Sequence, residues 1–213
     1  MATEDFFQTL LSQIAATPML EVVAVFAAIG YVLLAARQNI LCWFCALLST
    51  VCYVIVFWQV SLPFQTGLNG YYVLMAVYGF WQWRQGDNHL KAVTSLSMRE
   101  HALGISLVLG VTIALALLWQ EIAFTPFVYV DVFVTVASVV TTLLVAHKKL
   151  ENWIYWMVIN LVAAWLYWQV DLFLTSALFI LYCGLAMYGF WQWRKDYRLH
   201  HQDNQRSMQN ALR

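Results

Sequence analysis

Seven apolar stretches, each about as long as a membrane-spanning helix, constrain this chain more than any other feature. They lie at about residues 20–37, 39–58, 65–84, 102–120, 130–147, 152–169 and 173–193. A helix needs roughly 20 apolar residues to cross the hydrocarbon core of a bilayer. The runs are continuous, whereas the strands of a membrane barrel alternate over about ten residues. We therefore expect an all-α integral membrane protein with seven transmembrane helices.

The composition excludes several functional classes. Only 10% of the residues are charged, against about 25% in soluble domains. Eleven basic and eleven acidic residues balance, which gives no reason to expect nucleic acid as a partner. The apolar stretches carry no acid, base or metal-ligand set at mid-depth and no phosphate-binding loop. Cys42 and Cys45 form a CxxC inside a stretch without a second pair, so we read them as small apolar residues. We expect no enzymatic activity, no catalytic residues, no cofactor and no metal.

The distribution of basic residues predicts the orientation in the membrane. All eleven lie after the first, third, fifth and seventh stretches, and none lies in the alternate loops. By the positive-inside rule the C-terminus is cytoplasmic and the N-terminus is outside. Residues 1–19 contain Glu4 and Asp5 but no Lys or Arg. We interpret them as an interfacial segment, either a short helix ending near Pro18 or a partly ordered tail.

An internal repeat divides the chain. The sequence YGFWQWR at 78–84 recurs unchanged at 188–194, and the same offset aligns Trp43 with Trp153, Trp58 with Trp168, and Tyr72 with Tyr182. Shared hydrophobicity alone does not produce a seven-residue match, so we infer a duplication. The predicted division is a first three-helix repeat at 20–84, a cytoplasmic loop and linker helix at 85–129, a second repeat at 130–194 and a cytoplasmic tail at 195–213.

This division predicts a 3+1+3 arrangement of helices. The first and fifth stretches are separated by an even number of crossings, so the two repeats run parallel to each other. Parallel repeats related by an axis along the membrane normal are typical of transporters, with the substrate bound near the midplane. No ionisable residue is expected at mid-depth, where proton-driven carriers usually have one. The pattern therefore favours passive transport of a neutral or cationic solute.

The stretch 152–169 carries the strongest candidate binding face. Trp153, Trp156 and Asn160 are spaced i, i+3 and i+7, so they share one side of a helix. Indole rings stack on aromatic or cationic groups, and an amide both donates and accepts hydrogen bonds. In the first repeat the matching positions are Trp43, Ala46 and Thr50, so the repeats keep one Trp and differ at the other two positions. We expect the differing positions to set the substrate.

Further candidates and their alternatives complete the predicted site. Depth and helix face add Asn69, Gln59 and Tyr182 as ligand contacts. Asn160 could instead bond to a neighbouring helix, and the stripe formed by Thr135, Ser138 and Thr142 could bond to its own backbone rather than to a ligand. Tryptophans near the ends of the stretches are expected to be interfacial anchors; these are Trp58, Trp83, Trp119, Trp168 and Trp193.

The residues from Trp153 to Asn160 read WxxWxxxN. Together with the doubled YGFWQWR and the 3+1+3 arrangement, this resembles the PnuC-type nicotinamide riboside transporter family over residues 20–195. The resemblance implies a SWEET-like fold and facilitated diffusion of nicotinamide riboside for NAD biosynthesis. It also implies a homotrimer in the bacterial inner membrane. It assigns ligand contact to Trp153, Trp156 and Asn160.

Other functions stay open at this point. A SWEET-like sugar carrier, or a carrier of another vitamin or nucleoside, would also use Trp and Asn. From another class, the chain could be a membrane ligand sensor or an assembly subunit. Flux of solute across a bilayer that contains no other protein separates these readings.

Overall fold

The described part of the computed structural model, residues 19–59, 63–85, 92–119, 127–169 and 173–211, is almost entirely helical. Its helices are α2 (Met19–Ala36), α3 (Cys42–Gln59), α4 (Pro63–Arg84), α5 (Met98–Trp119), α6 (Val128–Ala146), α7 (Asn152–Gln169) and α8 (Phe173–Ala211). Each coincides with one of the seven predicted stretches, so the all-helical prediction is confirmed. Within these ranges β-pairing is limited to an isolated bridge between Thr94 and Lys149. The predicted interfacial segment lies almost wholly outside the described residues.

Hydropathy differs among the helices. By length and composition α2, α5 and α6 are apolar enough to cross a membrane, and α3 contains a shorter apolar stretch, Cys42–Val56. The helices α4, α7 and α8 carry much of the Trp, Tyr, Asn and Gln content, which lowers their mean hydropathy. These are also the helices on which most of the candidate site residues lie.

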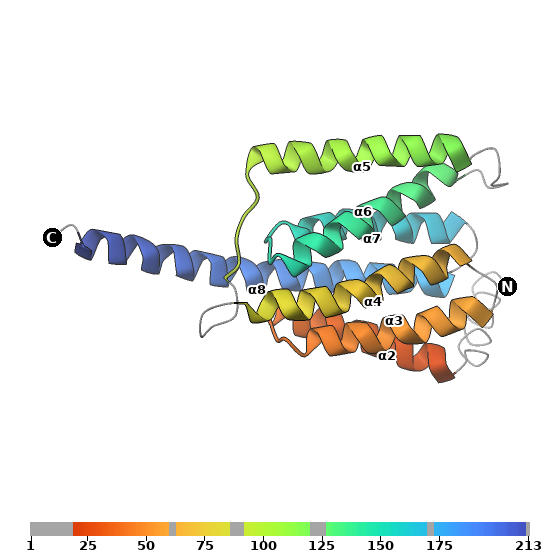
Figure 1. Cartoon of the computed structure of the whole chain (residues 1–213), viewed down its shortest axis with the longest axis horizontal. Helices are drawn as coiled ribbons and strands as arrows, with labels where there is room; N and C mark the ends of the chain where they lie inside the picture. Colours follow the sequence, from red (N-terminus) through yellow and green to blue (C-terminus); the bar gives the residue numbers. More distant parts are fainter. Residues whose placement is uncertain (1–18, 60–62, 86–91, 120–126, 170–172, 212–213) are drawn as a thin grey trace, which may run out of the picture.

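Six of the described helices form a closed ring. Helix α2 packs on α3 and α3 on α4, and likewise α6 packs on α7 and α7 on α8. The pairs α2–α8 and α4–α6 complete the ring. Helix α5 packs mainly on α6 and lies on the outside of the bundle (Figure 1), and a hydrogen bond between His101 and Tyr155 also joins it to α7. We call α2–α4 the first helix group and α6–α8 the second. Orientation in the membrane and the repeat boundaries stay predictions.

Helix α8 is longer than its predicted membrane span. It runs from Phe173 to Ala211 without interruption and projects well beyond the other helices (Figure 1). The predicted cytoplasmic tail, residues 195–213, follows the last span, and its residues 195–211 continue the same helix. The helix continues because neither Gly nor Pro follows Gly189, so the sequence contains no strong signal to end it.

The ends of α2 and α6 have the same geometry. After α2, the Gln38 N–H donates to the Ala35 carbonyl and the Asn39 N–H donates to the Leu34 carbonyl, each at 2.9 Å. This is a Schellman motif with Gln38 in the left-handed conformation (φ 54°). At the equivalent position after α6, Lys148 has φ 52°, and its backbone N–H donates to the Val145 carbonyl at 3.0 Å. We call the end of the ring that carries the loops 37–41 and 147–151 the basic end.

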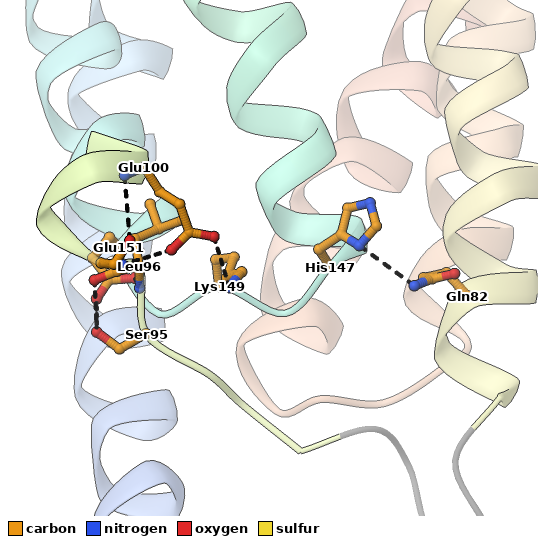
Figure 2. A network of polar contacts seen from close by, with 8 residues as sticks. Gln82, Ser95, Leu96, Glu100, His147, Lys149 and Glu151 are labelled. Carbon is orange, nitrogen blue, oxygen red and sulfur yellow. Dashed lines mark hydrogen bonds and ion pairs between the residues drawn. The ribbon is translucent and has the colours of Figure 1, made fainter. Parts of the chain in front are cut away.

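The basic end is braced by the segment that leads into α5. The Thr94 N–H donates to the Lys148 carbonyl at 3.0 Å, and the Leu150 N–H donates to the Thr94 carbonyl at 2.8 Å. Glu151 accepts hydrogen bonds from the Ser95 hydroxyl and the Leu96 N–H (Figure 2). The loop between α6 and α7 is therefore held by backbone bonds as well as by its own turn.

Tryptophans fill the core at the basic end. Trp83 and Trp193 are fully buried, so their assignment as interfacial anchors was wrong. Each indole N–H finds a carbonyl of the other helix group: Trp83 donates to Val145 at 3.2 Å, and Trp193 donates to Ala35 at 3.0 Å. A buried partner satisfies the one polar atom of the side chain, which removes its need for the membrane surface.

Two glycines make room for two further tryptophan rings. A Cβ built on Gly79 would lie 2.2 Å from the ring of Trp43, and one on Gly189 would lie 2.6 Å from the ring of Trp153. The Trp43–Trp83 and Trp153–Trp193 pairs both meet edge to face with centroids 5.4 Å apart. These glycines therefore serve as close packing contacts, and the duplication preserves both contacts.

Replacing Gly79 by Ala should lower stability, because the added methyl group overlaps a buried indole ring. Overpacking of this kind costs about 1–3 kcal/mol. The measurement is the thermal unfolding midpoint of the purified protein. Gly70→Ala on the same helix is the matched control, since nothing lies within 4 Å of its Cβ position. Equal midpoints for the two variants would contradict this account of the packing.

Candidate functional site

The predicted site residues fall at three levels along the helices. Trp43 and Trp153 lie in the first turn of α3 and α7, at the basic end. Asn160 lies near the middle of α7, about 10 Å further along its axis than Trp153 at 1.5 Å per residue. Thr50 lies at the middle of α3, and Trp156 lies in the second turn of α7, between Trp153 and Asn160. Asn69 and Tyr182 lie in the first halves of α4 and α8. Gln59 is the last residue of α3 and is exposed at the opposite end.

Trp43 and Trp153 have clear packing roles. They are 2% and 3% exposed, and each ring packs against a glycine and a second tryptophan. Neither indole N–H has a hydrogen-bond partner among the described residues. In this conformation they belong to the core of the basic end, and their contact with a ligand stays a prediction.

Asn160 has the strongest geometry for ligand binding. Its side chain is 5% exposed. Within the described part of the chain, the structure gives its amide no hydrogen-bond partner. The expected alternative, a bond to a neighbouring helix, is therefore not formed among these residues. The amide atoms are not among the fully enclosed polar atoms of the described residues that lack a partner, which belong to Trp43, Thr112, Asn152 and Trp153. The amide therefore keeps some contact with water, and a ligand that donates and accepts hydrogen bonds can replace that water.

Trp156 lies one turn from Asn160 on the same side of α7. It is partly buried and packs against the tryptophan-rich core. Its ring is thus positioned between the closed basic end and the unpaired amide. The helical spacing places an aromatic ring next to a hydrogen-bonding group, and their joint contact with a ligand stays a prediction.

Thr50 occupies the position in α3 that corresponds to Asn160. Its hydroxyl donates to the Ala46 carbonyl of its own helix at 2.8 Å. The donor is therefore already used, and only the hydroxyl oxygen can accept another bond. The two helix groups thus differ at the middle level, with a free amide on one side and a self-bonded hydroxyl on the other.

The remaining candidates are arranged around α4, α6 and α8. Asn69 is buried and has a partner, and Tyr182 is half-buried with its ring 5.9 Å from Phe179. Two hydroxyls of the polar stripe on α6 bond to the backbone of their own helix, which was the alternative to ligand contact. Thr142 donates to the Ser138 carbonyl at 2.8 Å, and Thr135 donates to the Asp131 carbonyl at 3.0 Å.

Two tyrosines of α4 contribute contacts that the sequence reading did not assign. Tyr72 forms a hydrogen bond with the Ser138 side chain, and the Tyr71 hydroxyl donates to the Val139 carbonyl at 3.0 Å. Both link the two helix groups at the middle level. The recurrence of Tyr72 as Tyr182 was the available signal, but it does not reveal which helix the hydroxyl reaches.

One charged side chain of the basic end points into the core. Lys148 lies in the loop after α6 and is fully buried, with its ammonium nitrogen 4.5 Å from the centre of the Trp83 ring. The turn at the end of α6 directs the side chain inward, so burial follows from backbone geometry. No cluster of three potential metal ligands occurs within the described residues.

A surface hollow along α8 is not a comparable site. It is open and lies on one helix at and beyond the basic end. Its lining residues are Trp191, Arg194, Lys195, Arg198, Leu199 and Gln202. An exposed strip on a single helix does not enclose a small molecule, so the middle level of the ring remains the better candidate.

Comparison with known proteins shows which family the chain resembles. The family described as nicotinamide mononucleotide transporter matches residues 18–195. The nicotinamide riboside transporters PnuC of Escherichia coli (strain K12) and Shigella flexneri are each 21% identical over 201 residues, covering 82% of this chain and 84% of the relative.

A solved structure has the same fold. The crystal structure of the vitamin B3 transporter PnuC superimposes with a TM-score of 0.72 at 22% identity, covering 91% of this chain and 88% of that chain. Residues 18–195, which the family model matches, contain all seven described helices except the part of α8 beyond residue 195. The family match spans most of the sequence, and the chain therefore belongs to the nicotinamide mononucleotide transporter family.

Proposed function

We propose that this chain is a multi-pass membrane transporter that carries nicotinamide riboside by facilitated diffusion for NAD biosynthesis. The observation that supports it best is the amide of Asn160, which has no hydrogen-bond partner among the described residues and lies one turn from Trp156. The relatives named as nicotinamide riboside transporters support the choice of substrate. The protein is a transporter and not an enzyme.

The chemistry of nicotinamide riboside suits the middle level. The substrate has a flat cationic ring, a carboxamide and a ribose. A desolvated cation on a Trp ring gains up to about 2 kcal/mol, and the Asn160 amide can pair with the carboxamide through both its donor and its acceptor. A carrier must also release its substrate, so moderate affinity without a fixed opposite charge is appropriate.

Nicotinamide mononucleotide is the second candidate, because the family description names it. Its phosphate would need Arg, Lys or backbone donors to replace water. The helical segments that form the middle of the ring, residues 42–59, 63–83, 128–146, 152–169 and 173–193, contain no Lys, Arg or His. A phosphate dianion would therefore be buried without a partner, and the riboside is favoured.

We assign the binding residues by level. Trp156 and Asn160 form the centre of the proposed site, with Thr50, Asn69 and Tyr182 around it. Trp43 and Trp153 bound it at the basic end, and Gln59 lies at the opposite entrance. The positive-inside rule supports a cytoplasmic basic end. We extend the proposal to a homotrimer in the bacterial inner membrane, as the family resemblance implies.

Reconstitution into liposomes tests the function. Labelled nicotinamide riboside should equilibrate across the bilayer without ATP or an ion gradient, and the rate should saturate. Unlabelled riboside should compete, whereas the mononucleotide and simple sugars should not. Competition by a sugar alone would indicate a SWEET-like carrier. Specific binding without flux by correctly folded protein would indicate a sensor.

Asn160→Ala should weaken nicotinamide riboside binding by about tenfold, because the amide pairing is lost. The unfolding midpoint should hold or rise, since the amide has no partner in the empty protein. Binding is measured on purified protein by calorimetry. Gln169→Ala, an amide at the exposed end of the same helix, should leave affinity unchanged. If both variants bound nicotinamide riboside with equal affinity, the ligand would contact a helix face other than the one that carries Asn160.

Two substitutions on α7, Trp153→Ala and Trp156→Ala, distinguish a tryptophan that packs in the core from one that contacts the ligand. Trp153→Ala removes a buried ring from the glycine contact and should lower the unfolding midpoint strongly. Trp156→Ala should reduce affinity about tenfold or more through loss of the stacking face, with a smaller change in stability. For each variant we compare the loss of nicotinamide riboside affinity with the fall in the unfolding midpoint. If the two losses stood in the same proportion in both variants, Trp153 and Trp156 would not have the separate packing and binding roles proposed here.

A further inference from the structure

The basic end of the ring is closed at its centre. Helices α4 and α8 are not neighbours in the ring, yet the rings of Trp83 and Trp193 have centroids 6.1 Å apart. Both side chains are fully buried. The two rings therefore meet across the middle of the bundle and fill it at this level.

A chain of polar contacts covers the same place. The Lys148 ammonium lies over the Trp83 ring and donates to the Gln38 side-chain oxygen at 2.9 Å. The Gln38 amide nitrogen in turn donates to the Asp196 carboxylate of α8. The contacts run from the loop after α6 to the loop after α2 and back to α8, so they join the two helix groups twice.

The backbone at these two positions supports a specific role for the side chains. Gln38 and Lys148 are equivalent in the duplication, and both adopt the left-handed conformation in which glycine is usually favoured. Retaining a long side chain here has a steric cost. The hydrogen bond between the two side chains explains why neither position is glycine.

The loop of Lys148 is held independently of its side chain. Its carbonyl accepts from the Thr94 N–H, and the neighbouring Lys149 forms an ion pair with Glu100 at 3.7 Å (Figure 2). The ammonium can therefore leave Gln38 while the loop keeps its backbone bonds. A reversible closure between the two helix groups requires a contact of this kind, which can break without unfolding the loop that carries it.

We propose that Lys148 and Gln38 form a latch that holds the basic end of the transport path closed and that opens before substrate passes. The inference rests on the proposed function, since a latch implies a path. Breaking a charge-assisted hydrogen bond should raise the population open at this end by roughly tenfold or more.

Cys42 provides a reporter for this opening. Its thiol is fully buried at the start of α3, close enough to Lys148 for an electrostatic interaction. Cys52 is also buried but lies ten residues further along α3, about 15 Å away along the helix axis. Single-cysteine proteins are made by replacing the other three cysteines with Ala. Labelling by a membrane-impermeant maleimide is followed in lipid nanodiscs without substrate.

In Lys148→Met and in Gln38→Leu, we expect the maleimide to label Cys42 about tenfold faster than in the parent protein. The labelling rate of Cys52 should not change. Lys148→Arg, which keeps the charge and the donor, should restore slow labelling. Lys149→Met is the matched control, because it removes the same charge one residue away. It should leave Cys42 slow.

Three results would overturn the latch. The first is an unchanged rate of Cys42 labelling in both latch variants. The second is an equal rise in the labelling rate of Cys52. The third is the same rise in Cys42 labelling in Lys149→Met. Because labelling is read without substrate, its outcome is independent of nicotinamide riboside flux in liposomes. Failure of the latch and failure of the proposed function are therefore distinguishable.

Discussion

Two indole N–H groups hold the ring of helices together at its basic end. Trp83 donates to a carbonyl of α6 and Trp193 donates to a carbonyl of α2, so each helix group supplies one donor and one acceptor. The close Trp–Gly contacts position the neighbouring rings beside them. Burial of these tryptophans would be costly without the two hydrogen bonds, and the closed ring depends on them.

The duplication keeps the packing and varies the polar groups. The YGFWQWR segments, the Trp–Gly contacts and the left-handed turns recur in both helix groups. The equivalent pairs that differ include Thr50 and Asn160, Gln38 and Lys148, and Asn69 and Phe179. The hydrogen bonds at the middle level are also uneven, because Tyr71 and Tyr72 link α4 to α6. A substrate without two-fold symmetry requires a site of this kind on a symmetric scaffold.

Much of the candidate site could be read from helical spacing. Trp156 and Asn160 share a face of α7 because their separation is fixed by 3.6 residues per turn. Spacing does not say how deep each residue lies in the packed ring or which partner it meets. Trp153 matched the same pattern but packs on Gly189, and Trp83 looked like a surface anchor but is fully buried.

The sequence by itself determined the helices and the internal repeat. A backbone in lipid must satisfy its own hydrogen bonds, so length and hydropathy suffice to locate the helices, and an exact seven-residue repeat reveals the duplication. Only the tertiary structure decided that Lys148 points into the core and that Asn160 lacks a partner. Burial and pairing depend on the atoms of other helices that lie opposite a side chain, and local sequence does not specify those atoms.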